Sequence, residues 1–301
     1  MHLQVSLKGV CIQNDMIKNI YRSKKTVFSC EIFPPKKDED LLNINSKLDM
    51  FKKIKPDFLS VTYGAGGSNA GKAVDIASYI QNECGIEALS HITSVGFNRQ
   101  RLAEGIADFR SHNICNVLAL RGDRPKTMTD EQYNSRDFVH ASDMASFIRS
   151  EYPDICIAGA CYPEKHFEAA TVDEDLVNLK RKADAGCDFL ISQLFFDNDF
   201  FYRMLERIRL MGLDIPVSAG IMPITKASQL GTTVSLSGTS IPKALSDTIA
   251  KYGDDPDDMK KAGIEFAIKQ IEDLLKHDVN GIHLYIMNKT ELADEIFSAV
   301  R

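Results

Sequence analysis

A carboxyl residue lies inside an apolar run near the start of the chain. Glu31 stands within Val27–Phe33, whose other members are mostly apolar. A carboxylate in such a strand is costly to ionise, so we expect its pKa to rise. Glu31 is therefore a candidate general acid near neutral pH. A salt bridge from Glu31 to a basic residue of a neighbouring strand is the other open interpretation.

A charged triplet follows a second apolar run. Arg121, Gly122 and Asp123 come directly after Asn116–Leu120. Glycine allows backbone to approach a ligand closely, arginine binds phosphate or carboxylate, and aspartate supplies a fixed negative charge. The alternative is an internal pair between Arg121 and Asp123 that only closes a turn.

Other apolar runs also end in polar side chains. These ends carry Thr62 with Tyr63, His91 with Thr93, Tyr162, Gln193 and Tyr285. In a parallel barrel, the carboxyl ends of the strands form one mouth where catalytic groups gather. The set therefore predicts an active site at that mouth.

A helical segment, Asp173–Ala185, carries a polar face. Asp175, Asn178 and Lys182 follow the i, i+3, i+7 spacing of one helix face. Together with Tyr162, His166 and nearby glutamates just upstream, this face can bind the ribose and phosphate groups of a large cofactor. A solvated helix face is the alternative.

A glycine-rich stretch almost matches a phosphate-binding P-loop. Gly66, Gly71 and Lys72 have the required spacing, but Ala73 stands where Mg²⁺ coordination needs Ser or Thr. We therefore favour a strand-to-helix loop that passes close to a ligand, and keep a nucleoside triphosphatase as an alternative.

Composition narrows the class of protein. The 301 residues include 36 Lys plus Arg and 42 Asp plus Glu, for a net charge of −6. This acidic balance argues against a protein that coats nucleic acid or a membrane. The first residues lack a signal-peptide core, and seven cysteines without C-x-x-C spacing predict reduced thiols and a cytoplasmic protein. No residue set has the spacing of a catalytic metal centre, and no Lys ends a strand as in a Schiff-base aldolase.

The order of elements predicts the fold. Apolar runs alternate with amphipathic segments such as 41–54, 200–211 and 257–276. The eight runs are Val27–Phe33, Phe58–Tyr63, Glu87–Thr93, Asn116–Leu120, Cys156–Cys161, Phe189–Phe195, Pro216–Ile221 and Gly281–Met287. They predict an α/β fold, a (β/α)8 TIM barrel formed as a single domain over 1–301, with 1–25 as a helical extension. A doubly wound open sheet is the rival. We expect a long polar loop over 124–140 and a lengthened connection over 231–252.

These segments together resemble the methylenetetrahydrofolate reductase family. The matching pieces run in order along the chain: Phe28–Pro35, Ser60–Gly66, His91–Thr93, Leu118–Asp123, Tyr162–His166, Asp175–Lys182, Asp184–Gly186, Gln193–Asp197, Gly220–Pro223 and His283–Asn288. The resemblance is to the short bacterial type, which has the catalytic barrel only.

The resemblance implies a TIM-barrel oxidoreductase that holds FAD noncovalently. NADH or NADPH would reduce the flavin, and 5,10-methylenetetrahydrofolate would take the hydride to give 5-methyltetrahydrofolate, in tetrahydrofolate interconversion and methionine biosynthesis. The family's general acid falls on Glu31, and its aspartate beside flavin and folate falls on Asp123. A homo-oligomer is also expected.

The family's binding residues carry over position by position. Its flavin contacts fall on Tyr63, Ala65, His91, Arg121, Gly122, Asp123, Ala141, Tyr162, His166, Ala169, Asp175, Asn178, Arg181 and Lys182. Its folate contacts fall on Asp123, Gln193, Gln229, Tyr285 and Lys289, and its nicotinamide contacts on Thr62 and Gln193.

The chain departs from the family at a few positions. Thr233 stands where relatives often have an aromatic residue that packs on folate or nicotinamide, and Lys289 stands where Arg is common. The first departure leaves NADH, NADPH and a protein donor open. A flavin barrel that oxidises another substrate, such as proline, and a folate- or flavin-binding module without activity are the remaining alternatives.

Overall fold

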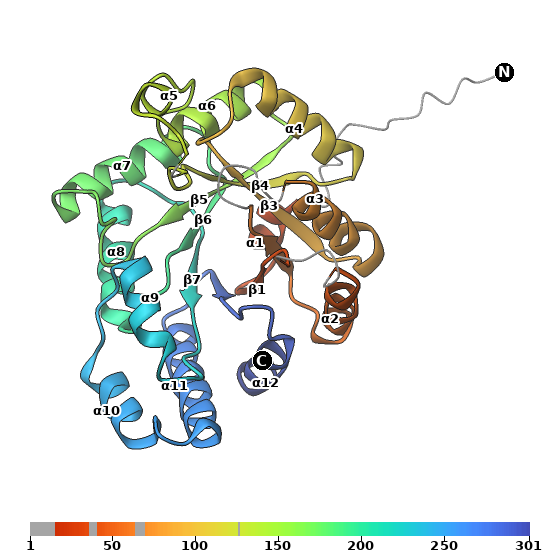
Figure 1. Ribbon diagram of the computed structural model, residues 1–301. Coiled ribbons are helices and arrows are strands. Elements are labelled where there is room, and N and C mark those ends of the chain that lie inside the picture. Colours follow the sequence, from red (N-terminus) through yellow and green to blue (C-terminus); the bar gives the residue numbers. More distant parts are fainter. Residues whose placement is uncertain (1–15, 36–40, 64–69, 126) are drawn as a thin grey trace.

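Eight parallel strands form a closed barrel in chain order (Figure 1). The computed structural model describes residues 16–35, 41–63, 70–125 and 127–301. The strands are β1 (Val27–Ile32), β2 (Phe58–Val61), β3 (Glu87–Thr93), β4 (Asn116–Leu120), β5 (Cys156–Cys161), β6 (Phe189–Ser192), β7 (Val217–Ile221) and β8 (Gly281–Leu284). Strand β8 pairs with β1 and closes the sheet. The predicted (β/α)8 TIM barrel is confirmed.

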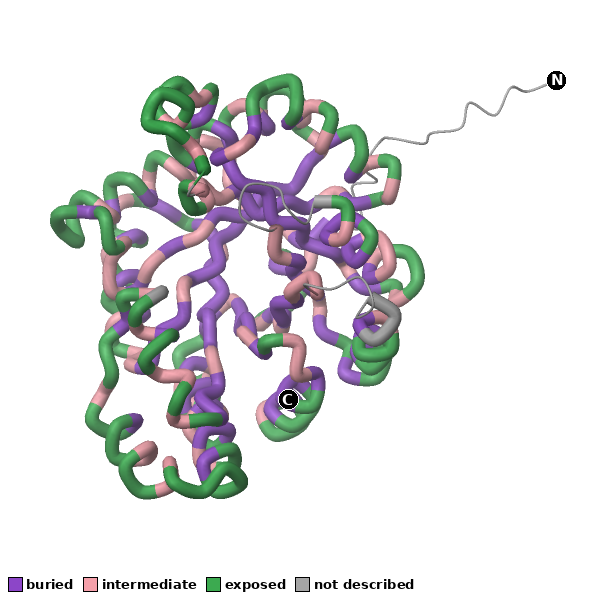
Figure 2. Tube along the Cα trace, viewed as in Figure 1, coloured by how far each residue is buried: buried purple, intermediate pink, exposed green. Residues whose placement is uncertain are grey.

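Helices surround the barrel, with their exposed faces outward and the strands buried inside (Figure 2). They are α1 (Ile17–Ser23), α2 (Leu41–Ile54), α3 (Ala70–Tyr79) with the π-helical turn η4 (Ile80–Cys84), α4 (Arg99–Ser111), α5 (Asp130–Asn134), α6 (Ala141–Glu151), α7 (Val172–Asp184), α8 (Asn198–Leu210), α9 (Gln229–Ser237), α10 (Lys243–Tyr252), α11 (Pro256–Lys276) and α12 (Thr290–Val300).

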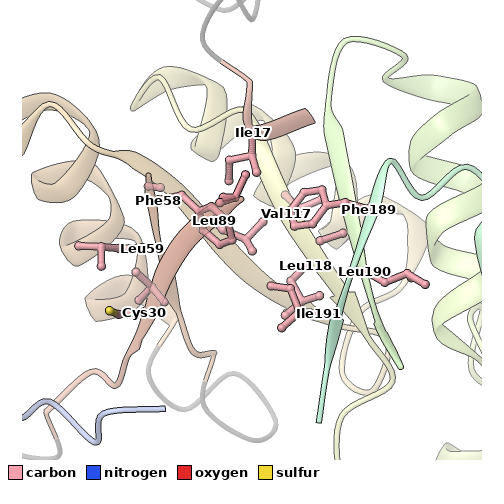
Figure 3. Packing of buried hydrophobic residues seen from close by; sticks show 14 of the residues in the cluster. Ile17, Cys30, Phe58, Leu59, Leu89, Val117, Leu118, Phe189, Leu190 and Ile191 are labelled. Atoms are coloured by element: carbon pink, nitrogen blue, oxygen red, sulfur yellow. The ribbon is translucent and has the colours of Figure 1, made fainter. Parts of the chain in front are cut away.

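The barrel interior is filled by large apolar side chains near the amino ends of the strands. Phe58, Leu89, Val117 and Phe189 are fully buried and come from four different strands (Figure 3). Burying such a side chain contributes about 1.5–3 kcal/mol. This packing fills the barrel at the amino ends of the strands. The carboxyl ends of the strands are therefore the place where a site can form.

Helix α1 covers the amino end of the barrel. The Ile17 backbone N–H donates to Asn116 Oδ1 at 3.0 Å, and the Tyr21 hydroxyl bonds Ser218 Oγ at 2.7 Å. The Tyr21 ring also lies 4.9 Å from the ring of Phe189. Because these partners stand at the amino ends of β4, β6 and β7, α1 closes the end opposite the site.

Two predicted connections contain helices. The segment 124–140 holds α5, whose Thr129 cap accepts from the Gln132 N–H at 3.2 Å while Gln132 bonds back to Thr129. This capping box starts a short helix that the polar composition concealed. The segment 231–252 is also mostly helical, because α9 and α10 occupy it.

Several strands end earlier than the apolar runs. Strand β1 stops at Ile32, ahead of Phe33 and two prolines, which cannot donate ladder hydrogen bonds. Strands β6 and β8 stop at Ser192 and Leu284, so the residues that follow turn towards the mouth of the barrel.

The cysteines of the described residues follow the sequence expectation with one exception. Five described cysteines are free: Cys30, Cys84, Cys156, Cys161 and Cys187. Cys115 forms a disulfide, so the expectation of a reduced thiol is wrong there; isolated cysteine spacings do not reveal spatial pairing. Within the described ranges, no helix is both long and apolar enough to span a bilayer.

Candidate active site

Two adjoining cavities open at the carboxyl ends of the strands. The larger has a volume of about 550 Å³ and the smaller about 320 Å³. Their common wall is formed by Leu120, Arg121, Ala160, Tyr162 and His166. The mouth predicted from strand-end residues is therefore a real cavity, divided into two parts.

Glu31 stands at the inner end of the larger cavity. It is paired in register with Ser60 of β2, and only 8% of the residue is exposed. Burial raises the pKa of its carboxyl to about 8, because an ionised carboxylate there loses its hydration. Glu31 is therefore protonated at neutral pH, as a general acid must be.

His91 is the ring that faces this carboxyl. Its Nε2 lies 3.5 Å from Glu31 Oε2 and has no hydrogen-bond partner among the described residues. Burial lowers the pKa of His91 to about 3, so the imidazole is neutral. A salt bridge between Glu31 and a charged neighbour is therefore not formed by this pair. The unpaired nitrogen marks a position where a ligand atom would complete a hydrogen bond.

Strand β8 and the residue that follows it contribute His283 and Tyr285 to the floor of the larger cavity. His283 Nδ1 bonds Ser29 Oγ at 2.8 Å, and burial lowers the pKa of His283 to about 3. The Tyr285 hydroxyl donates to the Ser192 carbonyl at 2.8 Å, and burial raises the pKa of that hydroxyl. The floor is thus built from neutral groups in an apolar setting.

The charged triplet after β4 reaches the shared wall and the rim. Gly122 has φ +77°, and a Cβ there would lie 2.8 Å from Thr93 Cβ, so only glycine fits without displacing Thr93. Arg121 pairs with Glu168, with one N–H···O bond of 2.8 Å, and this bond raises the pKa of Arg121. Asp123 is exposed at the edge of the larger cavity. The alternative that Arg121 pairs with Asp123 is therefore wrong, because the arginine bonds Glu168.

Helix α7 forms one side of the smaller cavity. The predicted face of Asp175, Asn178 and Lys182 lines it together with Arg181. Lys182 Nζ donates to the Ala160 carbonyl at 2.5 Å, and burial lowers its pKa. A half-buried cation with one carbonyl partner is a position that favours an anionic ligand.

The acidic and amide groups of that face are tied to the backbone and to each other. Asp175 Oδ2 accepts from the His166 N–H at 3.1 Å, and Asn178 Oδ1 accepts from Arg181 Nη1 at 3.0 Å. Ala141 and Ala169 also line this cavity, at the start of α6 and in the loop before α7. Small side chains there leave room for a ligand.

Two aromatic rings form part of the shared wall. The Tyr162 and His166 rings meet edge to face with centroids 4.7 Å apart. Burial raises the pKa of Tyr162 to about 12 and lowers that of His166. Both rings are therefore neutral at neutral pH and give the wall between the cavities an apolar surface.

Some predicted site residues line neither cavity within the described residues. Gln229 Oε1 accepts from Thr225 Oγ1 at 3.1 Å, and Lys289 Nζ donates to the same Thr225 Oγ1 at 3.1 Å, so these two share one partner. Thr62 and Tyr63 follow β2, and the Tyr63 ring packs 5.7 Å from Phe97. Ala65 and most of the glycine-rich stretch, 64–69, lie outside the described residues, as does 1–15 of the predicted extension.

Sequence reasoning missed several residues of the larger cavity. The missed residues are Phe33, Leu118, Leu120, Ala160, Phe167, Ile191, Leu194, Met222, Thr232, Ser237, His283 and Met287. His283 was detectable, because it precedes Tyr285 by two positions, and alternate residues of an extended segment point to the same side. The part of the chain that the structure describes contains no group of three His, Cys, Asp or Glu able to hold a metal.

The two cavities differ in what they can bind. The smaller one presents Arg121, Arg181 and Lys182 among polar groups, which suits phosphate and ribose. The larger one presents apolar walls, a protonated carboxyl and an unpaired imidazole nitrogen, which suits a flat ring that must be protonated. An elongated ligand that is anionic in one part and flat in the other fits both.

The chain matches the family model described as "Methylenetetrahydrofolate reductase" over residues 16–301. A "5,10-methylenetetrahydrofolate reductase" of Pectobacterium carotovorum is 32% identical over 88% of this chain and 87% of that protein. A protein of the same name from Escherichia coli is 31% identical over the same shares of the two chains.

Longer relatives match over part of their length. An Arabidopsis thaliana "Methylenetetrahydrofolate reductase (NADH) 1" is 34% identical over 91% of this chain but only 48% of its own length. The chain thus spans about half of the plant relative. Among solved structures, a Clostridium thermocellum protein that binds two copies of 5-methyl-5,6,7,8-tetrahydrofolic acid has a TM-score of 0.65 and 13% identity, covering 94% of this chain and 99% of that one. This last likeness supports the fold.

Proposed function

The chain belongs to the methylenetetrahydrofolate reductase family, and on that premise we propose that it reduces 5,10-methylenetetrahydrofolate to 5-methyltetrahydrofolate. FAD is the noncovalent cofactor of this proposal, and NADH or NADPH is the electron donor. The observation that carries the proposal is the protonated Glu31 beside the unpaired His91 nitrogen, inside a cavity that adjoins a cationic one.

The residues present fit FAD. The cations of the smaller cavity would hold its diphosphate, and Asp175 and Asn178 would bind hydroxyl groups. Gly122, which has no room for a side chain, lets backbone approach the flat ring, and His91 Nε2 offers it a hydrogen bond. When bound, FAD supplies the hydride-transfer chemistry between the nicotinamide nucleotide and the folate.

Glu31 supplies the proton for opening the folate's five-membered ring. The carboxyl proton moves to N10, the bond between N10 and the methylene carbon breaks, and an N5 iminium cation forms on the folate. Since burial holds the Glu31 pKa at about 8, the acid is loaded at neutral pH. General acid catalysis of this kind is worth about 10²–10⁴-fold in rate.

The polar rim positions the folate and its charge. Asp123 lies at the exposed edge of the same cavity and would stabilise the cation electrostatically. Gln193 and Tyr285 line the cavity on the β6 and β8 sides and would contact the pterin. Gln229 and Lys289, joined through Thr225, would meet the folate further out, with the Lys289 ammonium for the glutamate tail.

We further propose that Thr62, Tyr63 and Ala65 contact the nucleotides. We also propose that the protein is a cytoplasmic homo-oligomer that acts in methionine biosynthesis. Anaerobic titration with NADH and with NADPH identifies the donor, and light scattering during gel filtration gives the oligomeric state.

A two-stage spectroscopic experiment tests the function. The purified protein should be yellow, lose its flavin absorbance anaerobically on addition of NADH or NADPH, and regain it on addition of methylenetetrahydrofolate. Colourless protein that binds no added FAD would contradict the cofactor. Bleaching without recovery would contradict the folate substrate and favour the alternative of another flavin barrel.

A further inference from the structure

An exposed aromatic ring stands at the mouth of the larger cavity. Phe167, in the loop between β5 and α7, is 64% exposed and lines that cavity. The other phenyl and phenol rings in the described lining, Phe33, Tyr162 and Tyr285, are all less exposed. A large apolar ring left open to water forfeits hydrophobic stabilisation, unless a ligand covers it.

The loop that carries this ring is fixed on both sides. Glu164 accepts hydrogen bonds of 3.1 Å and 3.0 Å from the Ser240 N–H, and Glu168 pairs with Arg121. Phe167 lies between these two anchors in the sequence. Its exposure is therefore a feature of a tethered loop, and the ring is presented in a defined place.

The ring is also supported from one side. It stacks on His166 with centroids 4.7 Å apart and an interplanar angle of 23°, and His166 meets the Tyr162 ring edge to face. These three rings form a continuous aromatic row from the shared wall to the mouth. His166 covers one side of the Phe167 ring, and the exposed remainder of the ring is accessible for stacking by another flat group.

The wall contributed by α9 lacks such a ring. Its lining residues are Thr232, Thr233 and Ser237, and α9 contains no aromatic residue. The backbone of Gly238, at the end of α9, comes close to Phe167, since a Cβ on Gly238 would lie 4.0 Å from Phe167 Cβ. Phe167 therefore borders the polar wall of the cavity and adds an aromatic surface beside it.

We propose that Phe167 is a specificity-determining residue, whose ring packs against a flat aromatic ring of the nicotinamide nucleotide or folate in the outer part of the larger cavity. This inference rests on the proposed function and adds to it a binding residue after β5. The shared chemistry is stacking on a planar heteroaromatic ring, and the two ligands are distinguished by separate measurements.

Calorimetric titration of the FAD-loaded protein measures this contribution directly. The ligands are folic acid and the oxidised nicotinamide nucleotide whose reduced form bleaches the flavin, because neither can donate hydride. We compare wild type with Phe167→Ala and Phe167→Leu, which lack the aromatic ring, and with Phe167→Tyr, which keeps it. Leu210→Ala is the matched control, since Leu210 is 81% exposed on α8 and lines neither cavity.

We expect Phe167→Ala and Phe167→Leu to weaken binding of one ligand by about 2- to 12-fold, the range that aromatic stacking gives. Phe167→Tyr and Leu210→Ala should both bind that ligand with the affinity of the wild type. Unchanged affinity for both ligands in Phe167→Ala would overturn the inference and leave the proposed function standing. Wild-type protein that binds neither ligand would contradict the proposed function, and the inference with it. A melting curve for each variant verifies that it is folded.

Discussion

The two cavities share a wall but differ in the charge of the side chains that line them. The smaller one keeps cations, with Arg121 in an ion pair and Lys182 held by the Ala160 carbonyl. The larger one keeps the titratable groups of its inner part neutral, since burial gives Glu31 a pKa of about 8 and His91 a pKa of about 3. Charged side chains thus lie in the smaller cavity, where a ligand is held. Neutral ones lie in the inner part of the larger cavity, where a proton must be delivered.

This difference follows from the elements that build each cavity. The neutral groups of the larger cavity, Glu31, His91 and His283, project from β1, β3 and β8, inside the barrel, where desolvation dominates. Much of the smaller one comes from α7 and the loop before it, outside the sheet, where partners and water support charge. Position relative to the barrel decides which groups stay ionised.

Glu31→Gln should give the largest effect, because it removes the proton from the neutral cavity. We expect reoxidation of the flavin by methylenetetrahydrofolate to slow by about 10²–10⁴-fold or more. Bleaching by the nicotinamide nucleotide should be nearly unchanged, since that step needs no acid at N10. Anaerobic stopped-flow absorbance measures the two half-reactions separately, and an equal loss in both would remove Glu31 from the acid role.

Lys182→Met should weaken FAD binding in the smaller cavity and leave the reaction in the larger cavity unchanged. Loss of a charge-assisted contact typically costs about 1.5–3 kcal/mol, so FAD affinity should fall by about 12- to 150-fold. The rate of folate reduction at saturating FAD should stay close to that of wild type. Equilibrium dialysis with FAD measures the affinity.

Lys180→Met is the matched control for that change. Lys180 lies on the same helix, pairs with Asp184 at 3.0 Å, and lines neither cavity. If both variants lost FAD to the same degree, the loss would reflect the helix, and the ligand role of Lys182 would be contradicted.

The raised pKa of Glu31 in the larger cavity should also make the free energy of unfolding depend on pH. Between about pH 6.5 and 8 the unfolded chain carries an ionised Glu31, while the folded protein holds its proton, so unfolding free energy falls as pH rises. The expected loss is about 2 kcal/mol over this window. His91, with a folded pKa of about 3, contributes a slope of opposite sign only below about pH 6.5.

Urea denaturation of cofactor-free protein measures this slope. Glu31→Gln has no proton to lose, so its stability relative to wild type should increase over the same window and level off above about pH 8. A constant difference between the two proteins from about pH 6.5 to 8 would show that the carboxyl is already ionised.

Asp123→Asn should give the smallest effect, because Asp123 lies at the exposed rim. Removing a negative charge near the flavin should raise its reduction potential, by on the order of 20 mV for about 1 kcal/mol at a solvated position. Folate reduction should slow, since the N5 cation loses its counter-charge. Spectroelectrochemical titration checks the midpoint, and an unshifted value at full FAD occupancy would exclude the electrostatic role.

The barrel was predictable because its signal is repeated. Each of the eight apolar runs contains one strand, and 41–54 matches α2 at both ends. Strand ends were less predictable, because apolar residues such as Phe195 continue past the last ladder pair. Helix α5 depends on one capping box, Thr129 with Gln132, and so carries little periodic signal.

The site was predictable where a residue type alone implies chemistry. Glu31 inside an apolar strand and the face of Asp175, Asn178 and Lys182 both line cavities as expected. Partners were not predictable: Arg121 bonds Glu168, which is 47 residues away, and no spacing rule gives that contact. Phe167 was missed because an aromatic residue in a loop has no distinguishing pattern.

Difference infrared spectroscopy of wild type against Glu31→Gln, recorded across pH, tests the central claim that the larger cavity keeps its acid protonated. The account predicts a protonated carboxyl band at pH 7 that is present in wild type, absent in the variant, and lost with a midpoint near pH 8. A carboxylate band at pH 7, with a midpoint close to the ordinary glutamate value of about 4.3, would contradict it.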